Sequence, residues 1–422
     1  MKNLILLLTV QFFVFLPHTL LKANLVNDTI SMGPGYTNDV FYSLENGTVK
    51  TEPRNNWDLA FYTVRWSAGV MINDGMGVVL YTYPYSDTTG WQTMDVTDIE
   101  SWKPVYNSDT IWEEGAFNAN SLEHPDYGWG VYNMVTHDVI GDSLFVLQLA
   151  DGSLKKIWIQ RKNSTSNTYY FKYANIDGSG EVAEVLNVND FTDKHFVYYS
   201  ISNQSVVDRE PSMESWDILF SRFMGTTFDN EGNPSRYPVV GVLNNPMAGS
   251  NRFQPVGQDF EDWNSLPMIF ERSVIGHDWK QFDMELFQWL LADDLVYFVK
   301  TVQEDVYKLT FDYFGGTSNG KTGLQKTAVS LASIGQDIDN LNGMKVSPNP
   351  ASEQLVVSLE EQRSTSATFK IFNQTGSLIH SQVINPLQST INISLQNFRN
   401  GMYLILIDTE KGQLRGKFLV IN

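Results

Sequence analysis

The chain of 422 residues contains no cysteine. Disulfides, catalytic thiolates and thiolate metal sites are therefore excluded, and stability must come from apolar cores. Basic residues are also scarce, with 29 Lys and Arg against 48 Asp and Glu, which gives a net charge of −19. A charge of this sign argues against non-specific binding to nucleic acid or to anionic membranes.

Long apolar runs are missing everywhere except at the N-terminus. There Lys2 precedes an apolar run over 4–16, followed by Pro17 and the small residue Ala23. This pattern is typical of a secretory signal peptide, which we predict over 1–23 and which is too short for a membrane helix. Charges and glycines interrupt every later hydrophobic run, so we expect no membrane-spanning segment in the mature chain.

Aromatic residues, in contrast, are plentiful at 13%, with 11 Trp and 19 Tyr. They suit β-strands, and most of the chain has the pattern of short strands. The β-rich runs 139–149 and 154–161 flank an Asp-Gly pair at 151–152, which predicts a hairpin. Helical periodicity is rare, and the best short helix is expected over 282–291. The sequence therefore predicts an all-β protein.

An internal repeat divides the region before the C-terminus. The letters FYSL at 41–44 and WDLAF at 57–61 recur as YYSI at 198–201 and WDILF at 216–220. The order of the parts is kept, so a duplication explains them better than chance. We place copy one at 36–192, copy two at 195–328 and a small, polar linker at 329–343.

The C-terminal region carries a second set of ordered motifs. They are VSPNPA at 346–351, IFNQTG at 371–376, GMYLIL at 401–406 and KFLV at 417–420. Each is a short apolar alternation bounded by Pro, Asn or Gly, which is typical of a small antiparallel sandwich. Their order and wording resemble the C-terminal sorting domain of type IX secretion cargo. We predict this domain over 344–422, as an Ig-like β-sandwich.

The resemblance implies a route and a set of sorting residues. The signal peptide would take the chain across the inner membrane, and the type IX secretion machinery would take it across the outer membrane of a Bacteroidetes cell. The protein would be secreted or held on the outer surface, where surface lipopolysaccharide is a possible anchor after processing. Proline fixes the entry dihedrals and glycine permits positive φ in tight turns. The expected sorting residues are Pro348, Asn349, Pro350, Gly376, Gly401 and Tyr403.

Copy one resembles a further family. The WDLAF strand, a Gly- and Asn-rich segment at 69–77 and a W-x-x-Y-N-x-x-x-H stretch at 129–137 precede the closing hairpin. This order is similar to the HmuY family of exported Bacteroidetes proteins, whose founding members bind haem in an all-β fold. Copy two keeps the Trp-Asp strand and the last hairpin but lacks the Tyr-Asn-x-x-x-His wording. The resemblances together imply two tandem HmuY-like β domains followed by the sorting sandwich.

Haem binding needs axial ligands, which here must be His or Met. His124 and His137 lie in copy one and are the candidate ligands, and Met134 or Met71 could replace one of them. A histidine beside a strand is more often a surface or capping residue, and fold does not carry function. We therefore expect a non-enzymatic binding or adhesion protein, with haem or another small ligand as the alternative.

Enzymatic motifs are absent from the sequence. It has no Gly-x-Ser-x-Gly elbow, no His-Glu-x-x-His and no phosphate loop. The acidic pairs at 113–114 and 293–294 would point to opposite faces of a strand, which is unsuitable for a catalytic dyad. We predict no catalytic residues, although a glycosidase with carboxylates from distant strands stays open.

Two stretches imitate calcium loops, at 175–180 and 337–343. An EF-hand needs a bidentate acid at the twelfth position, where this chain has Leu186 and Pro348. Turns and linker explain both stretches better, so we predict no metal site. A looser calcium site built on backbone carbonyls stays open.

Overall fold

The computed structural model describes residues 25–122, 124–229, 231–330, 344–348, 351–359, 365–373, 378–399, 401–409 and 412–420. The predicted signal peptide and most of the predicted linker lie outside these residues. The described chain is almost entirely β, as predicted, and its one α-helix is α1 (Gly316–Asn319). None of its helices combines the length and apolar character needed to cross a membrane.

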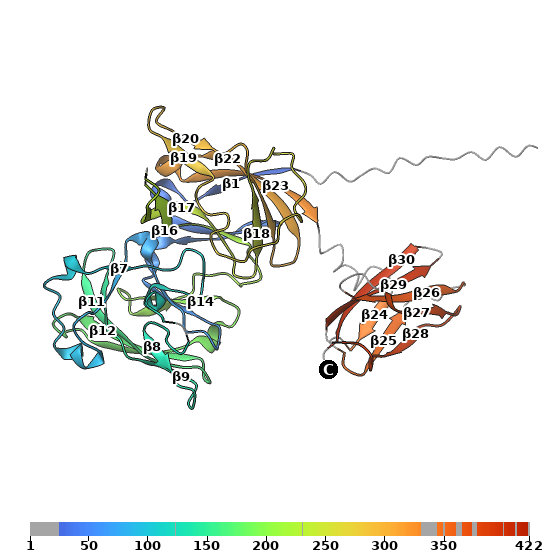
Figure 1. The fold of residues 1–422 in the computed structure, drawn as a ribbon, viewed down its shortest axis with the longest axis horizontal. Helices are drawn as coiled ribbons and strands as arrows, with labels where there is room; N and C mark the ends of the chain where they lie inside the picture. Colours follow the sequence, from blue (N-terminus) through green and yellow to red (C-terminus); the bar gives the residue numbers. More distant parts are fainter. Residues whose placement is uncertain are drawn as a thin grey trace, which may run out of the picture.

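The first of two body sandwiches packs a four-stranded sheet against an eight-stranded sheet (Figure 1). The smaller sheet has the order β15 (Ser205–Val207), β14 (Phe196–Ser200), β4 (Leu59–Tyr62), β5 (Val70–Ile72). The larger sheet has the order β13 (Val182–Asn187), β12 (Thr168–Asn175), β11 (Leu154–Asn163), β10 (Phe145–Gln148), β6 (Val79–Thr82), β7 (Pro104–Val105), with β9 (Asp138–Gly141) on β11 and β8 (Gly130–Tyr132) on β9. The predicted Asp-Gly hairpin is confirmed as β10–β11. Phe61, Trp129 and Phe171 are fully buried between the sheets.

The second body sandwich has a four-stranded and a five-stranded sheet. The four-stranded sheet has the order β17 (Pro234–Asn244), β16 (Ile218–Phe228), β2 (Asn38–Ser43), β3 (Gly47–Pro53). The five-stranded sheet has the order β1 (Val26–Ser31), β23 (Lys321–Ser330), β22 (Val306–Phe314), β21 (Val296–Lys300), β18 (Gly249–Phe253). Tyr42, Phe220 and Tyr297 are buried between them.

The helix predicted over 282–291 is wrong. These residues belong to the hairpin of β19 (Lys280–Asp283) and β20 (Gln288–Leu291). The apolar spacing that imitates a helix comes from the hairpin tip, where Met284, Leu286 and Phe287 are 71%, 63% and 76% exposed. They do not share one buried helical face.

The two sequence copies exchange their first strands. Strand β2 of copy one pairs with β16 of copy two, with Tyr42 opposite Ile218. Strand β14 of copy two pairs with β4 of copy one, with Tyr199 opposite Leu59. The first sandwich is therefore one continuous segment, about 59–207, placed between the two segments that build the second. The limits 36–192 and 195–328 describe the repeat in sequence, and the packed sandwiches cross them.

The repeated Trp-Asp motif fastens each exchanged strand. Asp217 Oδ2 accepts the backbone N–H of Leu44 at 2.8 Å, and Asp58 Oδ2 accepts that of Ile201 at 2.7 Å. These contacts are equivalent in the two copies, because FYSL and YYSI end in Leu44 and Ile201. Each copy of the Trp-Asp motif thus binds the end of the strand contributed by the other copy, and we call this pair of contacts the reciprocal clamp.

The C-terminal domain is a sandwich of its own. Its three-stranded sheet is β24 (Met344–Ser347), β25 (Gln354–Leu359), β28 (Thr390–Ser394). Its four-stranded sheet is β27 (Leu378–Ile384), β26 (Ala367–Asn373), β29 (Gly401–Thr409), β30 (Gly412–Val420). Leu355, Phe369 and Ile405 are buried between these sheets, because alternate residues of each strand face the same side.

Candidate functional site

A cleft of about 720 Å³ opens beside the first sandwich. One wall is aromatic and is formed by Tyr85, Trp102 and Tyr106. Polar and charged groups surround it, namely Lys103, Glu114, Asn120 and Arg236. Arg236 comes from β17 of the second sandwich, so both sandwiches contribute to the cleft.

Hydrogen bonds and ring contacts hold the aromatic wall in place. Asp98 accepts hydrogen bonds from the Tyr85 hydroxyl and, at 3.1 Å, from the Trp102 indole N–H. The first of these bonds raises the pKa of Tyr85. The buried ring of Tyr83 lies behind both, 5.7 Å from Tyr85 and 5.8 Å from Trp102 between centroids. These contacts preorganise the wall for a ligand, and Tyr85 stays accessible because it is 60% exposed.

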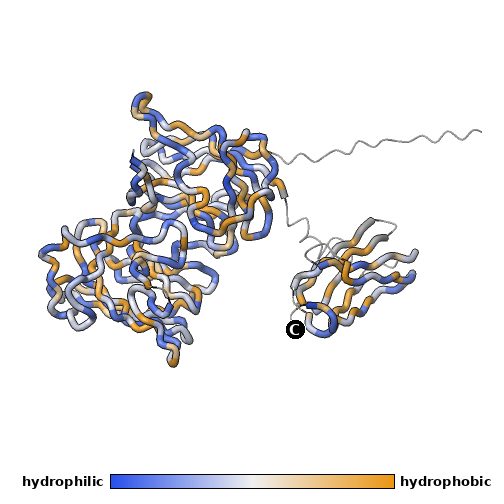
Figure 2. The backbone as a smooth tube through the Cα atoms, in the orientation of Figure 1, coloured by the Kyte–Doolittle hydropathy of each residue, from blue (hydrophilic) through white to orange (hydrophobic). Residues whose placement is uncertain are grey.

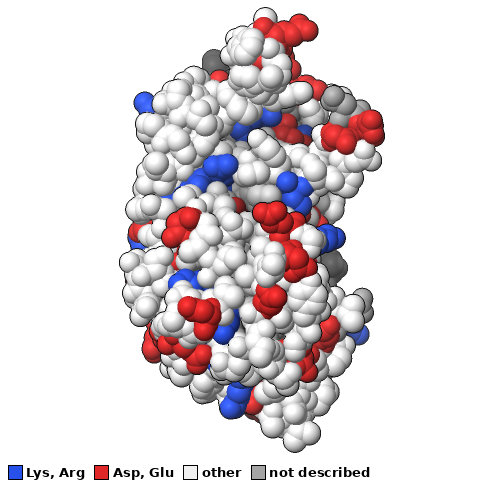
Figure 3. Space-filling view, turned by 90° about the vertical axis from the view of Figure 1, so that its left-hand side faces the viewer, with Lys and Arg blue, Asp and Glu red and all other residues white. Residues whose placement is uncertain are grey.

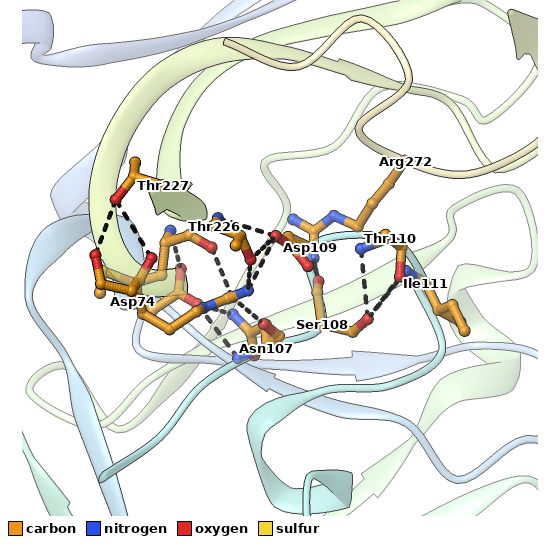
Figure 4. Close-up of polar contacts among 12 residues, drawn as sticks. Asp74, Asn107, Ser108, Asp109, Thr110, Ile111, Thr226, Thr227 and Arg272 are labelled. Carbon is orange, nitrogen blue, oxygen red and sulfur yellow. Dashed lines mark hydrogen bonds and ion pairs between the residues drawn. The ribbon is translucent and has the colours of Figure 1, made fainter. Parts of the chain in front are cut away.

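The loop beneath the cleft is held by arginines of the second sandwich (Figure 4). Arg236 donates to the carbonyl of Asn107 and Arg272 to that of Ser108, both at 2.7 Å. The Asn107 amide also donates to Asp74 Oδ2 at 2.8 Å. Arg236 further forms a 3.0 Å ion pair with Asp109. No motif marks this loop in the sequence, which explains why it was not predicted as part of a site.

The cleft combines groups that suit binding of a polar ligand with apolar faces. Aromatic faces cover C–H surfaces, while the surrounding Lys, Asn and Arg side chains supply hydrogen-bond donors. Among its described lining residues, Glu114 is the single carboxylate. Glycoside hydrolysis uses a pair of carboxylates about 5–10 Å apart. Asp98, which accepts from Tyr85 and Trp102, is a further carboxylate beside the aromatic wall.

The predicted haem ligands His124 and His137 lie close to one aromatic ring. The Tyr132 ring centroid is 5.3 Å from that of His124 and 6.0 Å from that of His137. The Tyr132 hydroxyl is 2.6 Å from Nδ1 of His137, which leaves Nε2 as the nitrogen for a metal. Both histidines are exposed. The structure thus brings these two residues together, whereas Met71 is buried in a different cluster with Tyr198.

Met134 is placed at the tip of the β8–β9 hairpin, and this tip has a structural counterpart in copy two. Asn133 Oδ1 accepts the N–H of Val135, and Asp283 Oδ1 accepts that of Glu285, both at 2.8 Å. Both tips expose large apolar side chains, and the backbone tube of Figure 2 has hydrophobic colouring at the hairpin ends. The exposed fractions in copy one are 69% for Met134 and 87% for Val135. Sequence reasoning missed this correspondence, because Phe287 stands where copy one has His137.

The calcium-like stretch at 175–180 is a turn. Asp177 Oδ1 accepts the backbone N–H of Ser179 at 2.9 Å and its hydroxyl at 2.7 Å. The second stretch, 337–343, lies outside the described residues. Within the described part of the chain, no three His, Asp or Glu side chains gather in a way that could hold a metal ion.

The predicted sorting residues fall in the C-terminal sandwich. Pro348 is exposed after β24, and Gly401 begins β29. Tyr403 is 7% exposed, stacks on Phe418 at 5.4 Å and donates to the carbonyl of Arg399 at 2.9 Å. Tyr403 therefore stabilises the sandwich itself. The other expected sorting residues lie outside the described chain: Asn349, Pro350 and Gly376.

Surface charge does not form a single field on the face shown in Figure 3. Acidic and basic side chains are interspersed there among neutral ones. A nucleic-acid site would show clustered Lys and Arg on its binding face. This face lacks such a cluster.

The comparison with protein families identifies the C-terminal sandwich. Residues 345–422 match the family described as the secretion system C-terminal sorting domain. The predicted type IX sorting domain is confirmed. The protein therefore belongs to the class of exported or cell-surface proteins that the type IX machinery handles.

The comparisons with curated proteins and with solved structures give no further assignment. No curated protein matches the sequence. A DUF3244 family protein with an immunoglobulin-like β-sandwich fold from Bacteroides vulgatus ATCC 8482 is 20% identical, with coverage of 18% of this chain and 84% of that one and a TM-score of 0.17. A structure titled for Dscam isoform specificity is 7% identical, with coverage of 94% and 99% and a TM-score of 0.13. At these TM-scores neither similarity carries an argument.

Proposed function

We propose that the duplicated body is a non-enzymatic binding module, and that its aromatic cleft binds a glycan at the cell surface. The ordered wall of Tyr85 and Trp102 is the observation that carries this proposal. Sugar rings present apolar C–H faces and many hydroxyl groups, so they match aromatic faces bordered by hydrogen-bonding side chains. The exposed hairpin tips add apolar contact surface of the kind found at protein interaction sites.

Replacing Trp102 with alanine should weaken glycan binding about 10- to 100-fold, as expected for the loss of an aromatic anchor. The full chain is screened on a glycan array, and hits are titrated by calorimetry. Trp66→Ala is the matched control, because Trp66 is 60% exposed and lies against His137 rather than the cleft. Equal affinities for Trp102→Ala and the unaltered protein would remove the cleft from the proposal.

Haem is a second candidate ligand, favoured by the convergence of both histidines on Tyr132. The residues fit a haem site in part, since two exposed imidazoles and the exposed side chains of Trp66 and Met134 lie in the same region. Haem would supply iron, which takes two axial ligands. Tyr132 would orient His137 through the bond to Nδ1, as outer-shell partners of metal-binding histidines do.

Hemin titration of the full chain tests this second candidate. A Soret shift is expected, and His137→Ala or His124→Ala should lower hemin affinity at least about tenfold, since even outer-shell partners have effects of that size. His380→Ala, in the sorting domain, is the control. A Soret shift that both body variants keep would exclude these residues as ligands. Fold membership in the HmuY family and anchoring to lipopolysaccharide stay predictions.

A further inference from the structure

The two body sandwiches meet along a seam of aromatic and charged residues. In the first sandwich Trp57 contacts Tyr198 at 5.0 Å between ring centroids, and in the second Trp216 contacts Phe41 at 5.2 Å. Trp112 packs against both clusters and so joins the two sandwiches. The seam encloses a cavity of about 50 Å³.

The cavity is rich in buried cations. Four arginines and two aspartates line it: Arg54, Arg209, Arg222, Arg272, Asp39 and Asp74. Both carboxylates already have donors, since Asp39 pairs with Arg209 at 2.7 Å and Asp74 accepts from Asn107. Arg54 and Arg272 are each 4% exposed, and neither takes part in an ion pair between described residues. Among the residues that line the cavity, the arginines therefore outnumber the carboxylates.

Three polar atoms of residues that line the cavity have no hydrogen-bond partner in the described part of the protein. They are Nη1 of Arg54, Nε1 of Trp57 and Nε of Arg272. All three are N–H donors, because guanidinium and indole groups have no acceptor atom. A buried donor without an acceptor is costly, and a buried charge without a counter-charge costs more. An acceptor within reach of these donors would remove that cost, and a negatively charged one would also offset the charge of the arginines.

We propose that the seam cavity binds a small monovalent inorganic anion, chloride under physiological conditions. A cavity of about 50 Å³ has room for one particle of about the size of water, which takes about 30 Å³ of liquid volume, and chloride is close to that size. A halide accepts several N–H bonds and donates none, which matches the three donors. The site lies in the seam and is independent of glycan or haem binding.

The ionisation of the arginines agrees with this assignment. Burial lowers the pKa of Arg54, and it lowers the pKa of Arg272 to about 10, opposed by the charge of Asp74. A pKa of about 10 still leaves Arg272 charged at neutral pH. The nearby charges of Asp74 and Asp109 offset part of that charge, and a bound anion would offset more of it.

Thermal unfolding of the full chain tests the site. Sodium chloride is compared with sodium gluconate at equal ionic strength, so that screening is the same in both. The midpoint should rise by about 5 °C at 200 mM chloride, because a ligand that binds only the native state stabilises it. Bromide is also a monovalent halide, so it should raise the unfolding midpoint as chloride does.

Two variants remove donors from the cavity. Arg54→Met deletes the guanidinium but keeps an unbranched side chain, and Trp57→Phe removes the five-membered ring with its N–H while keeping a six-membered aromatic ring. Each should abolish or reduce the chloride-dependent shift. Arg65→Met is the matched control, because Arg65 is exposed, and it should keep the full shift. Trp57→Phe keeps the test decisive if Arg54→Met fails to fold.

Crystals of the full chain grown with bromide provide a direct readout. An anomalous peak within hydrogen-bond distance of Arg54 and Trp57 is the expected result. Water in the cavity, with no anomalous peak and equal midpoints in chloride and gluconate, would overturn the proposal.

Discussion

Deletion of residues 344–422 is expected to stop the protein in the periplasm, with essentially complete loss from the cell surface and medium. The reason is that this segment is a self-contained sandwich with its own core, matched to the secretion system C-terminal sorting domain. The body has a separate pair of cores, so its folding does not depend on the deleted strands. Fractionation of a type IX-secreting host, followed by immunoblotting, measures the distribution.

A gain-of-function control separates missorting from misfolding. Residues 344–422 are fused to a periplasmic reporter, which should then reach the surface. Protease resistance of the truncated body in the periplasmic fraction shows that it is folded. Normal surface levels of the truncated protein would refute the sorting role of the C-terminal sandwich.

Asp217→Ala should lower the free energy of unfolding of the body by about 3–5 kcal/mol. Asp217 is 5% exposed and accepts the backbone N–H groups of Leu44 at 2.8 Å and Val302 at 3.0 Å. Alanine would leave both donors buried without an acceptor, at about 1–3 kcal/mol each, more when the lost acceptor is charged. Because Leu44 is 173 positions away in the chain, the loss would release the exchanged strand β2. Urea unfolding followed by tryptophan fluorescence measures the change.

Three further substitutions calibrate that result. Asp58→Ala removes the equivalent bond to Ile201 and should destabilise the first sandwich in the same direction. Asp217→Asn keeps one acceptor oxygen, so its loss should be smaller. Asp262→Ala changes an exposed aspartate and should stay within about 0.5 kcal/mol of the unaltered protein. Equal stability of Asp217→Ala and Asp262→Ala would refute the clamp.

The sorting domain was the part of the fold most accessible to sequence reasoning. Its strands are short and follow one another with local turns, so alternation and punctuation by Pro, Asn and Gly define them. The hairpin across Asp151-Gly152 was predictable for the same reason, since Gly152 has a positive φ of 84°. The helix predicted over 282–291 was wrong because the apolar residues at the exposed hairpin tip have the spacing expected of a helix.

The candidate sites, in contrast, could be predicted from the sequence only in part. The cleft wall joins Tyr85 to Trp102 through Asp98, and its floor depends on Arg236 of the other sandwich. Residues so far apart in the chain have no common spacing from which a site could be read. His124 and His137 were predicted as the two ligands of one site, but their shared contact with the Tyr132 ring is evident only in the structure.

The sequence alone indicated the C-terminal sorting domain, the β class and the repeated motifs, because local alternation, turn residues and repeated letters encode these features directly. The tertiary structure alone decided how the copies combine. Strand exchange places the equivalent Trp-Asp motifs against strands of the opposite copy, at separations that no local pattern specifies. The same exchange creates the seam and buries its arginines, since burial of a charge depends on what the whole fold packs around it.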